Sequence, residues 1–233
     1  MSLATQMRRA AAGVSAGGFN PETSITWHSL FWAEGTAMSA LGYSDTDAVP
    51  TWPNETGETD ATSVVLPAAY NAANPDYNNQ PTINFAGNDN YLSADLVSDT
   101  TLPLSVVLIC NAGYGFDGWY AVGGEATIGT RSKKWYMYAG GLLYSAVDND
   151  TDPHLLVGHF TTGSSVMTVD GTEVISAVTT ATPFQQIYLA GNGTKGLRGD
   201  MPFVGFYEGD VTADGSWSDF VTFAEDHYGL TIA

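Results

Sequence analysis

The sequence predicts an all-β fold, a two-sheet antiparallel sandwich with a short C-terminal helix and an N-terminal arm. Three observations predict it. From Phe19 to Tyr207 the apolar residues alternate with a period near 2 rather than 3.6. Short β-rich runs follow one another without helical segments between them. Gly supplies 26 of 233 residues and charged residues only 14%, so the chain is polar mainly through Ser, Thr, Asn and Gly, a composition suited to strands and turns.

The strands are expected where β-branched, aromatic and aliphatic residues cluster between turn residues. Asp170-Gly171, between two such runs, is a typical two-residue hairpin turn. The expected strands are Ile25–Ala33, Thr82–Phe85, Tyr91–Ala94, Leu104–Cys110, Trp119–Val122, Thr127–Thr130, Trp135–Tyr138, Leu142–Val147, Leu155–Thr161, Ser165–Val169, Thr172–Ala177, Gln186–Ala190 and Phe203–Tyr207.

Two segments depart from this pattern. The Pro-, Asn- and Asp-rich stretch Thr46–Pro81 is expected to be a long surface excursion. Near the C-terminus, Ser216 and Asp219 resemble a capping box, and Gly229 is placed to end a helix. The apolar residues of that helix fall on one face: Trp217, Phe220, Val221, Ala224 and Tyr228.

The first eighteen residues are expected to be a separate arm, and residues 19–233 one domain. Residues 2–12 form a short helix candidate that ends at Gly13 and Gly17-Gly18. A helix of this length is marginal alone, so the segment is either a frayed tail or an arm docked on a partner. We expect a docked arm, with Leu3, Met7, Arg8 and Arg9 as its contact residues.

The charge balance excludes two classes of partner. Lys and Arg number 7 against 25 Asp and Glu, a net charge of −18, and no cation occurs between Ala10 and Thr130. Nucleic-acid binding requires a basic surface, and anionic membranes attract one, so we expect neither. No run approaches the roughly 18 apolar residues of a membrane span. The small residues after Arg8-Arg9 do not form the apolar core of a secretory signal, and none is expected.

The single cysteine, Cys110, cannot form an internal disulfide or a Cys-rich zinc site. It lies in the apolar run Leu104–Cys110, which is typical of a buried strand. We interpret it as a small core residue, because nothing near it in the sequence would activate a nucleophilic thiol.

Several short motifs occur in a recognisable order along the chain: Trp32-Ala33, Asp47–Asn54 with Gly57, Pro81–Leu92, Met167–Val174, Ile187–Asn192, Gly199–Phe206 and Asp226–Leu230. Together they resemble the concanavalin A-like (laminin G-like) jelly-roll domains of bacteriophage and bacterial surface proteins. The resemblance spans about residues 25–231. Asn54 and Asn90 stand where the family pattern has Asp.

The resemblance implies a jelly roll, but lectins, glycosidases and structural modules share that fold. Glycosidases of this architecture carry a Glu-x-Asp-x-x-Glu strand, and none of the eight glutamates here belongs to one. His154 and His159 flank a strand and are expected to point to opposite faces, so they do not form a metal pair. We therefore expect no enzyme.

Two groups of residues are binding candidates. Tyr and Trp rings stack on sugars while Asp and Asn bind hydroxyl groups, so we expect carbohydrate contacts among Tyr114, Asp117, Trp119, Trp135 and Tyr138. About half of the aromatic residues must instead face the core. Asp148, Asp150 and Asp152 alternate as hard oxygen ligands and could bind calcium, the one cofactor considered, although a polar hairpin loop is the alternative.

The expected function is that of a non-enzymatic virion protein, a phage head-decoration, spike or fibre subunit. The N-terminal arm would bind other capsid or tail proteins, and the sandwich would bind host glycans. We also expect the protein to form a homo-oligomer. The alternative is a secreted or surface-displayed bacterial carbohydrate-binding module, which would be extracellular; an enzyme ranks third.

Overall fold

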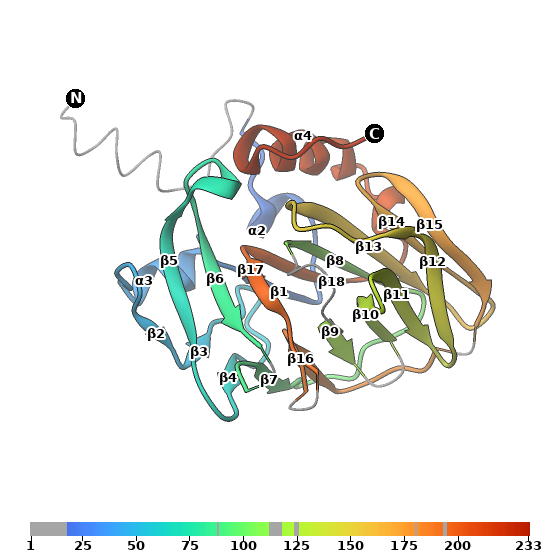
Figure 1. The fold of residues 1–233 in the computed structure, drawn as a ribbon, viewed down its shortest axis with the longest axis horizontal. Helices are drawn as coiled ribbons and strands as arrows, with labels where there is room; N and C mark the ends of the chain where they lie inside the picture. Colours follow the sequence, from blue (N-terminus) through green and yellow to red (C-terminus); the bar gives the residue numbers. More distant parts are fainter. Residues whose placement is uncertain (1–17, 88, 112–117, 124–125, 180, 193–194) are drawn as a thin grey trace.

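The computed structural model describes residues 18–87, 89–111, 118–123, 126–179, 181–192 and 195–233. The side chains of residues 119 and 121–123 lie outside this description. The fold is an all-β jelly-roll sandwich with antiparallel strand pairing, as the sequence predicts (Figure 1). The expected docking residues Leu3, Met7, Arg8 and Arg9 lie outside the described residues, so the arm remains a prediction.

Two large sheets form the layers of the sandwich. The six-stranded sheet has the order β1 (Ser29–Trp32), β18 (Phe203–Glu208), β8 (Leu104–Cys110), β13 (His154–Phe160), β14 (Ser164–Val169) and β15 (Thr172–Val178). The eight-stranded sheet has the order β12 (Leu142–Asp148), β11 (Lys134–Ala139), β10 (Ala126–Arg131), β9 (Gly118–Gly123), β16 (Gln186–Leu189), β7 (Leu92–Asp95), β4 (Ala61–Ser63) and β3 (Thr51–Trp52).

A third sheet corrects the expectation of a long surface excursion over Thr46–Pro81. That stretch contributes β3 and β4 to the eight-stranded sheet and supplies most of a four-stranded one. The four-stranded sheet has the order β17 (Arg198–Met201), β6 (Gln80–Ala86), β5 (Ala68–Asn74) and β2 (Ala48–Val49). Val49, Trp52 and Ala61 of this stretch are fully buried in the main core, whereas Val64, Val65 and Leu66 are exposed, so the segment is partly core and partly surface.

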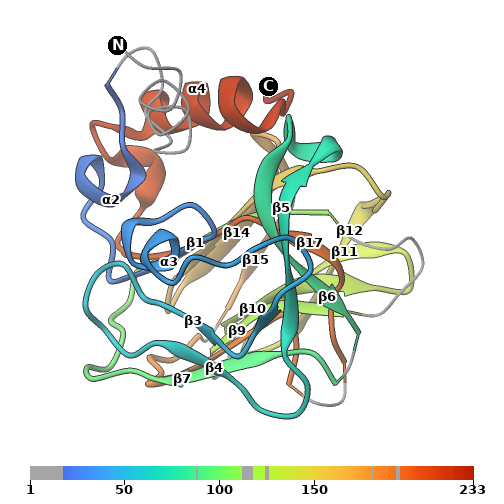
Figure 2. The same cartoon turned by 90° about the vertical axis from the view of Figure 1, so that its left-hand side faces the viewer.

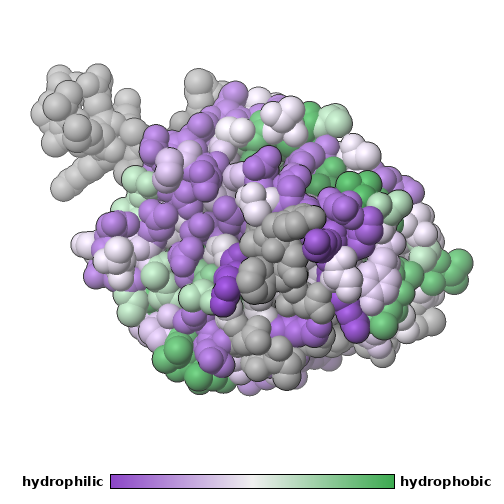
Figure 3. Space-filling model, viewed as in Figure 1, coloured by the Kyte–Doolittle hydropathy of each residue, from purple (hydrophilic) through white to green (hydrophobic). Residues whose placement is uncertain are grey.

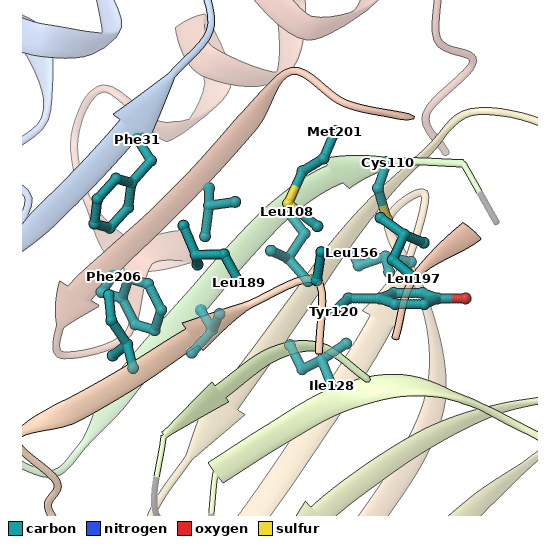
Figure 4. Close-up of a cluster of buried hydrophobic side chains, with 14 of the residues drawn as sticks. Phe31, Leu108, Cys110, Tyr120, Ile128, Leu156, Leu189, Leu197, Met201 and Phe206 are labelled. Atoms are coloured by element: carbon teal, nitrogen blue, oxygen red, sulfur yellow. The ribbon is translucent and has the colours of Figure 1, made fainter. Parts of the chain in front are cut away.

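The main core lies between the two large sheets. In Figure 4, Leu108, Leu156 and Phe206 of the six-stranded sheet approach Ile128 and Leu189 of the eight-stranded sheet. All five side chains are at most 1% exposed. Burying aliphatic and aromatic side chains contributes about 1.5–3 kcal/mol each, so this interface is the main source of stability.

Strand β8 is buried on both faces, which explains its unbroken apolar sequence. Val106 and Leu108 face the main core, and Val107 and Ile109 face a second one. Helix α4 (Trp217–Tyr228) forms that second core, with Phe220 and the other residues of its apolar face packed on the outer face of the six-stranded sheet. Figure 1 shows α4 along one side of the sandwich.

The C-terminal helix ends as expected but begins differently. Gly229 caps it in the left-handed region (φ 74°), and its N–H donates to the Glu225 carbonyl at 2.9 Å. Ser216 makes no side-chain capping bond, so the expected capping box is wrong. Instead, the Ser216 N–H donates to Oδ1 of Asp214 at 2.8 Å before the helix begins.

Short helices fill the connections. Helix α2 (Pro21–Ser24) is capped by the Asn20 side chain, and helix α3 (Thr36–Ala40) follows β1. Two 3-10 turns occur at Pro75–Tyr77 and Val211–Ala213. The described helices are all too short or too polar to cross a membrane.

Local turns follow the sequence signals. Asp170 and Gly171 both have positive φ (48° and 79°), the geometry of the expected hairpin turn. Asn54 is buried, and its Oδ1 accepts from the Leu30 N–H at 3.1 Å. Asn90 donates from Nδ2 to the Leu66 and Pro67 carbonyls. Both asparagines therefore hold structural hydrogen bonds at the positions where they depart from the jelly-roll pattern that the sequence resembles.

Candidate functional site

A groove of about 570 Å³ lies on the outer face of the eight-stranded sheet. Ile128, Met137 and Ile187 of this sheet face the main core, so residues that alternate with them face outward. We call the hollow the tyrosine groove, and its lining residues are Thr127, Arg131, Tyr136, Tyr138, Leu142, Phe184, Gln185, Gln186, Tyr188 and Asn192.

Strand register brings together residues that are far apart in the sequence. Leu142 pairs with Tyr138, and Tyr138 pairs with Thr127. Thr127 pairs with Val122, which pairs with Tyr188. These five positions form one row across four strand boundaries, with Tyr138 and Tyr188 near its two ends.

A second row runs beside the first. Tyr144 pairs with Tyr136, Tyr136 with Gly129, and Gly129 with Trp119. The Tyr136 and Tyr144 rings are tilted at 47° with centroids 5.8 Å apart. Tyr136 is 3% exposed, so most of its ring is covered by neighbouring groups. Position 119 lies in this row, while its side chain lies outside the description.

Hydrogen bonds hold Tyr188 in position. Its hydroxyl group donates to Oε1 of Gln186 at 2.5 Å, and Nε2 of Gln186 donates to Oδ1 of Asp95 at 2.7 Å. The ring of Tyr91 lies on the same face, with its centroid 6.2 Å from that of Tyr188. These contacts order an aromatic side chain at the groove before any ligand arrives.

The groove differs in charge from the rest of this acidic chain. None of its described lining residues is acidic, and Arg131 supplies a guanidinium group. Burial raises the pKa of Tyr136 to about 12, while the Arg131 charge acts in the opposite direction. Tyr136 therefore remains neutral at physiological pH. Within the described part of the chain, Arg131 forms no ion pair with a carboxylate.

This combination of groups suits carbohydrate. Tyrosine rings offer apolar faces to the C–H groups of a pyranose ring. The exposed side-chain amide of Gln185 carries both donors and acceptors for hydroxyl groups. The amides of Gln186 and Asn192 lie beside it, and Gln186 also holds Tyr188 and Asp95. The volume falls within the range of about 300–1,000 Å³ that small-ligand sites occupy. Figure 3 shows mainly hydrophilic side chains on the face in view, with hydrophobic ones in separate areas near its edges.

The structure places only one of the five expected carbohydrate contacts, among the residues it describes, at the groove. Tyr138 lines the groove. The expectation for Trp135 is wrong: its side chain is 2% exposed, faces the main core and packs edge-on against His154, with centroids 5.1 Å apart. Tyr114 and Asp117 lie outside the described residues, as does the side chain of Trp119, so these three remain predictions.

Sequence reasoning missed Arg131, Tyr136 as a lining residue, and Tyr188 with its neighbouring glutamines. The signal for Tyr188 was present, because it alternates between the apolar residues Ile187 and Leu189 of a predicted strand. The register that places β16 next to β9 could not be read from the sequence, since the two strands lie about sixty residues apart.

The aspartates of the expected calcium loop contact protein groups in the structure. Asp148 forms an ion pair with Lys134, and Asp150 accepts from Nε2 of His154 at 2.7 Å. The Asp152 N–H donates to Asp150 at 2.9 Å. Across the described ranges, no three or more His, Cys, Asp or Glu residues are grouped as metal ligands. Asn149 is buried there with both amide atoms unpartnered. Calcium binding by Asp148, Asp150 and Asp152 remains a prediction.

The thiol of Cys110 is enclosed in the core. Its residue is 1% exposed, and burial raises the pKa of the thiol, followed by the charge of Asp170. The thiol is therefore protonated and inaccessible, as expected for a core residue.

Comparison with known proteins identifies related folds. The sequence matches no protein-family model and no curated protein. The sialidase of Trypanosoma rangeli superposes with a TM-score of 0.58 at 11% identity, over 95% of this chain and 37% of that chain. The complex of this sialidase with sialic acid superposes with a TM-score of 0.55 at 9% identity, over 96% of this chain and 38% of that chain.

A structure of botulinum neurotoxin type C superposes with a TM-score of 0.50. Cell entry of that toxin depends on interaction with two ganglioside molecules. The identity is 8%, over 78% of this chain and 50% of that chain. This chain thus spans between about a third and a half of these proteins. At these identities the similarity establishes the fold alone.

Proposed function

We propose that this protein binds a glycan in the tyrosine groove and releases it unchanged. The observation that carries the proposal is the row joining Tyr138 to Tyr188, flanked by the amides of Gln185, Gln186 and Asn192 on the exposed face of a sheet. Aromatic faces and amides at this spacing supply stacking and hydroxyl recognition together. Two proteins of similar fold support this function: a sialidase whose structure contains sialic acid, and a neurotoxin whose cell entry depends on gangliosides.

The lining of the groove supports binding without catalysis. Glycosidases of the common type use two carboxyl groups on either side of the scissile bond, about 5–10 Å apart. No Asp or Glu is among the described lining residues of the groove. We therefore propose that the protein is not an enzyme.

A glycan array followed by titration calorimetry tests the function. We expect wild-type protein to bind a subset of oligosaccharides. Tyr138→Ala and Tyr188→Ala each weaken binding about tenfold, because each removes a stacking surface. Tyr43→Ala serves as the control, since Tyr43 lies in a different cavity. An array without a binder, or tyrosine variants that bind like wild type, would contradict the proposal, and so would hydrolysis of a bound glycan.

We further propose that the glycan-binding chain is a virion subunit, held on capsid or tail proteins by residues 1–18. The sequence resemblance to bacteriophage domains supports this, and a surface-displayed or secreted carbohydrate-binding module is the alternative. Deleting residues 1–18 should prevent incorporation into particles while leaving glycan binding intact. Undiminished incorporation would contradict the anchoring role.

A further inference from the structure

A second cavity, of about 470 Å³, lies away from the tyrosine groove. It lies between α3 and the strands β5 and β6, on the side that Figure 2 turns toward the viewer. We call it the Glu34 cavity, and its lining residues are Glu34, Met38, Ser39, Gly42, Tyr43, Tyr70, Ala72, Asn79, Gln80 and Pro81.

A buried carboxylate forms part of its wall. The side chain of Glu34 is only 2% exposed, and its Oε1 accepts from Nε2 of His227 at 2.7 Å. His227 approaches from α4, where it stacks on Phe223 at 4.8 Å. Burying a carboxylate is costly unless it is partnered, and here His227 partners one oxygen while the Tyr228 hydroxyl group also interacts with the carboxylate.

Two tyrosine rings form another part of the wall. The centroids of Tyr43 and Tyr70 are 6.0 Å apart, and the rings are tilted by 34°. Both are half-buried against the main core. Burial raises the pKa of Tyr70, as does the charge of Glu34, so the ring remains neutral and lies near the carboxylate.

The chain around the cavity holds these rings in place. The Thr46 N–H donates to the Tyr70 carbonyl at 2.7 Å, and the Tyr70 N–H donates to the Asp47 carbonyl at 2.8 Å. Glu55 caps α3 through the N–H groups of Ala37 and Met38, at 2.8 and 3.2 Å. Hydrogen bonds thus fix the backbone of both walls, from main-chain carbonyls on one side and the Glu55 carboxylate on the other, and the cavity is formed without a ligand.

The electrostatic environment favours a cation. No Lys or Arg lines the cavity among the described residues, and the whole sequence from Ala10 to Thr130 contains none. Asp47 lies close enough to Tyr43 to raise the pKa of that tyrosine further, after burial. Asp45 accepts from the N–H of Ala72, a lining residue, at 3.1 Å. Apart from His227, which is bonded to Glu34, no described basic side chain lies at the cavity to repel an entering cation.

We propose that the Glu34 cavity binds a small organic ammonium ion, with Glu34 as its counter-ion and the rings of Tyr43 and Tyr70 as its walls. A cation near an aromatic face is attracted by the ring quadrupole within about 6 Å. Met38 and Pro81 suit the alkyl groups of such an ion. The site is independent of glycan binding, because its lining residues are all different from those of the tyrosine groove.

Choline chloride is the probe, titrated by calorimetry against the full chain at pH 8. The comparison ligand is 3,3-dimethylbutan-1-ol, which has the shape of choline without the charge. We expect saturable binding of choline, with a Kd on the order of 1 mM or tighter, and no saturation by the alcohol. Equal binding of both ligands, or no binding of choline, would overturn the proposal.

A pair of variants separates the ring from its hydroxyl group. Tyr70→Leu should weaken choline binding at least about fivefold, whereas Tyr70→Phe, which retains the ring, should bind within about twofold of wild type. Thermal unfolding checks that both variants are folded, and Tyr43→Leu repeats the test on the other ring. A Phe variant as weak as the Leu variant would show hydroxyl recognition and contradict the proposal. Tyr138→Ala should leave choline binding unchanged, whether or not the groove binds a glycan.

Discussion

Nδ1 of His154 lies 2.6 Å from Oδ2 of Asp170, a contact that ties the first residue of β13 to the β14–β15 turn. Asp170 also accepts from the Leu155 N–H at 2.8 Å, and Nε2 of His154 lies 2.7 Å from Asp150. Burial alone would lower the pKa of His154. The hydrogen bonds and charges of Asp170 and Asp150 outweigh burial and raise the pKa to about 9.

The first prediction concerns stability above neutral pH. The folded protein holds a proton on His154 that the unfolded chain releases near pH 6.5, so the contribution is complete below that pH and disappears as pH rises toward about 9. We expect the free energy of unfolding to fall by about 2 kcal/mol across this window. This is less than the full pKa shift would give, because the Asp150 side chain is 59% exposed and solvent screens its charge. Urea titrations between these pH values measure it.

The matched comparison uses His154→Gln and His159→Gln. The first variant should lose the decline, because its amide does not titrate. The second should retain it, since His159 contacts the hydroxyl group of Ser105 at 3.2 Å and not a carboxylate. Parallel pH curves for wild type and His154→Gln would rule out the assignment.

The second prediction tests the close approach of the two large sheets. Gly158 of β13 faces Ile128 of β10, and a Cβ atom at position 158 would lie 2.5 Å from the Ile128 Cδ1 atom. Gly158→Ala should therefore force this pair apart and destabilise the protein by about 1–3 kcal/mol. Gly163→Ala is the control, since no atom lies within 4 Å of its added Cβ. Equal stability of the two variants in urea titrations would show that the sheets are less tightly packed.

The third prediction tests the link between α4 and the six-stranded sheet. Nε1 of Trp32 donates to the hydroxyl oxygen of Tyr228 at 2.8 Å, and both side chains are buried. Tyr228→Phe leaves the indole N–H without an acceptor, so we expect a loss of about 1–3 kcal/mol in urea titrations. Tyr207→Phe removes a hydrogen bond to Asp214 that is longer, at 3.2 Å, and only half-buried, so this variant should lose less stability than Tyr228→Phe. The opposite ranking would contradict this account.

Sequence reasoning located the strands where local signals were strong. The run Leu104–Cys110 matches β8 residue for residue, because a strand buried on both faces must be apolar throughout. Strand β5, Ala68–Asn74, was missed because its alanines and asparagines have weak β propensity. Its pairing with β6 stabilises it, and that contact is not encoded in the local sequence.

The binding residues show both a local signal and a similar limit. Trp135 and Tyr136 are neighbours in one strand, so alternation requires one to face the core and the other the groove. The apolar residues Met137 and Ala139, which alternate with Tyr136 and Tyr138, are the local signal that assigns Trp135 to the core. The structure places Trp135 in the core, because Met137 and Ala139 on the same face complete it. The Glu34 cavity could not be predicted, since its walls come from α3, β5 and the β5–β6 turn.

The last prediction concerns the charge of the glycan and depends on the proposed function. Arg131 lies in a groove without a described acidic lining residue, in a chain of net charge −18, so its guanidinium group is available for a carboxylate or sulfate on a sugar. Arg131→Gln should weaken binding of acidic oligosaccharides about tenfold and of neutral ones less than about threefold. Arg131→Lys retains the charge without the planar fork and should fall between. Titration calorimetry at low and high salt measures this, because a charged contact weakens with ionic strength. A loss of equal size for neutral and acidic glycans would assign Arg131 a structural role instead.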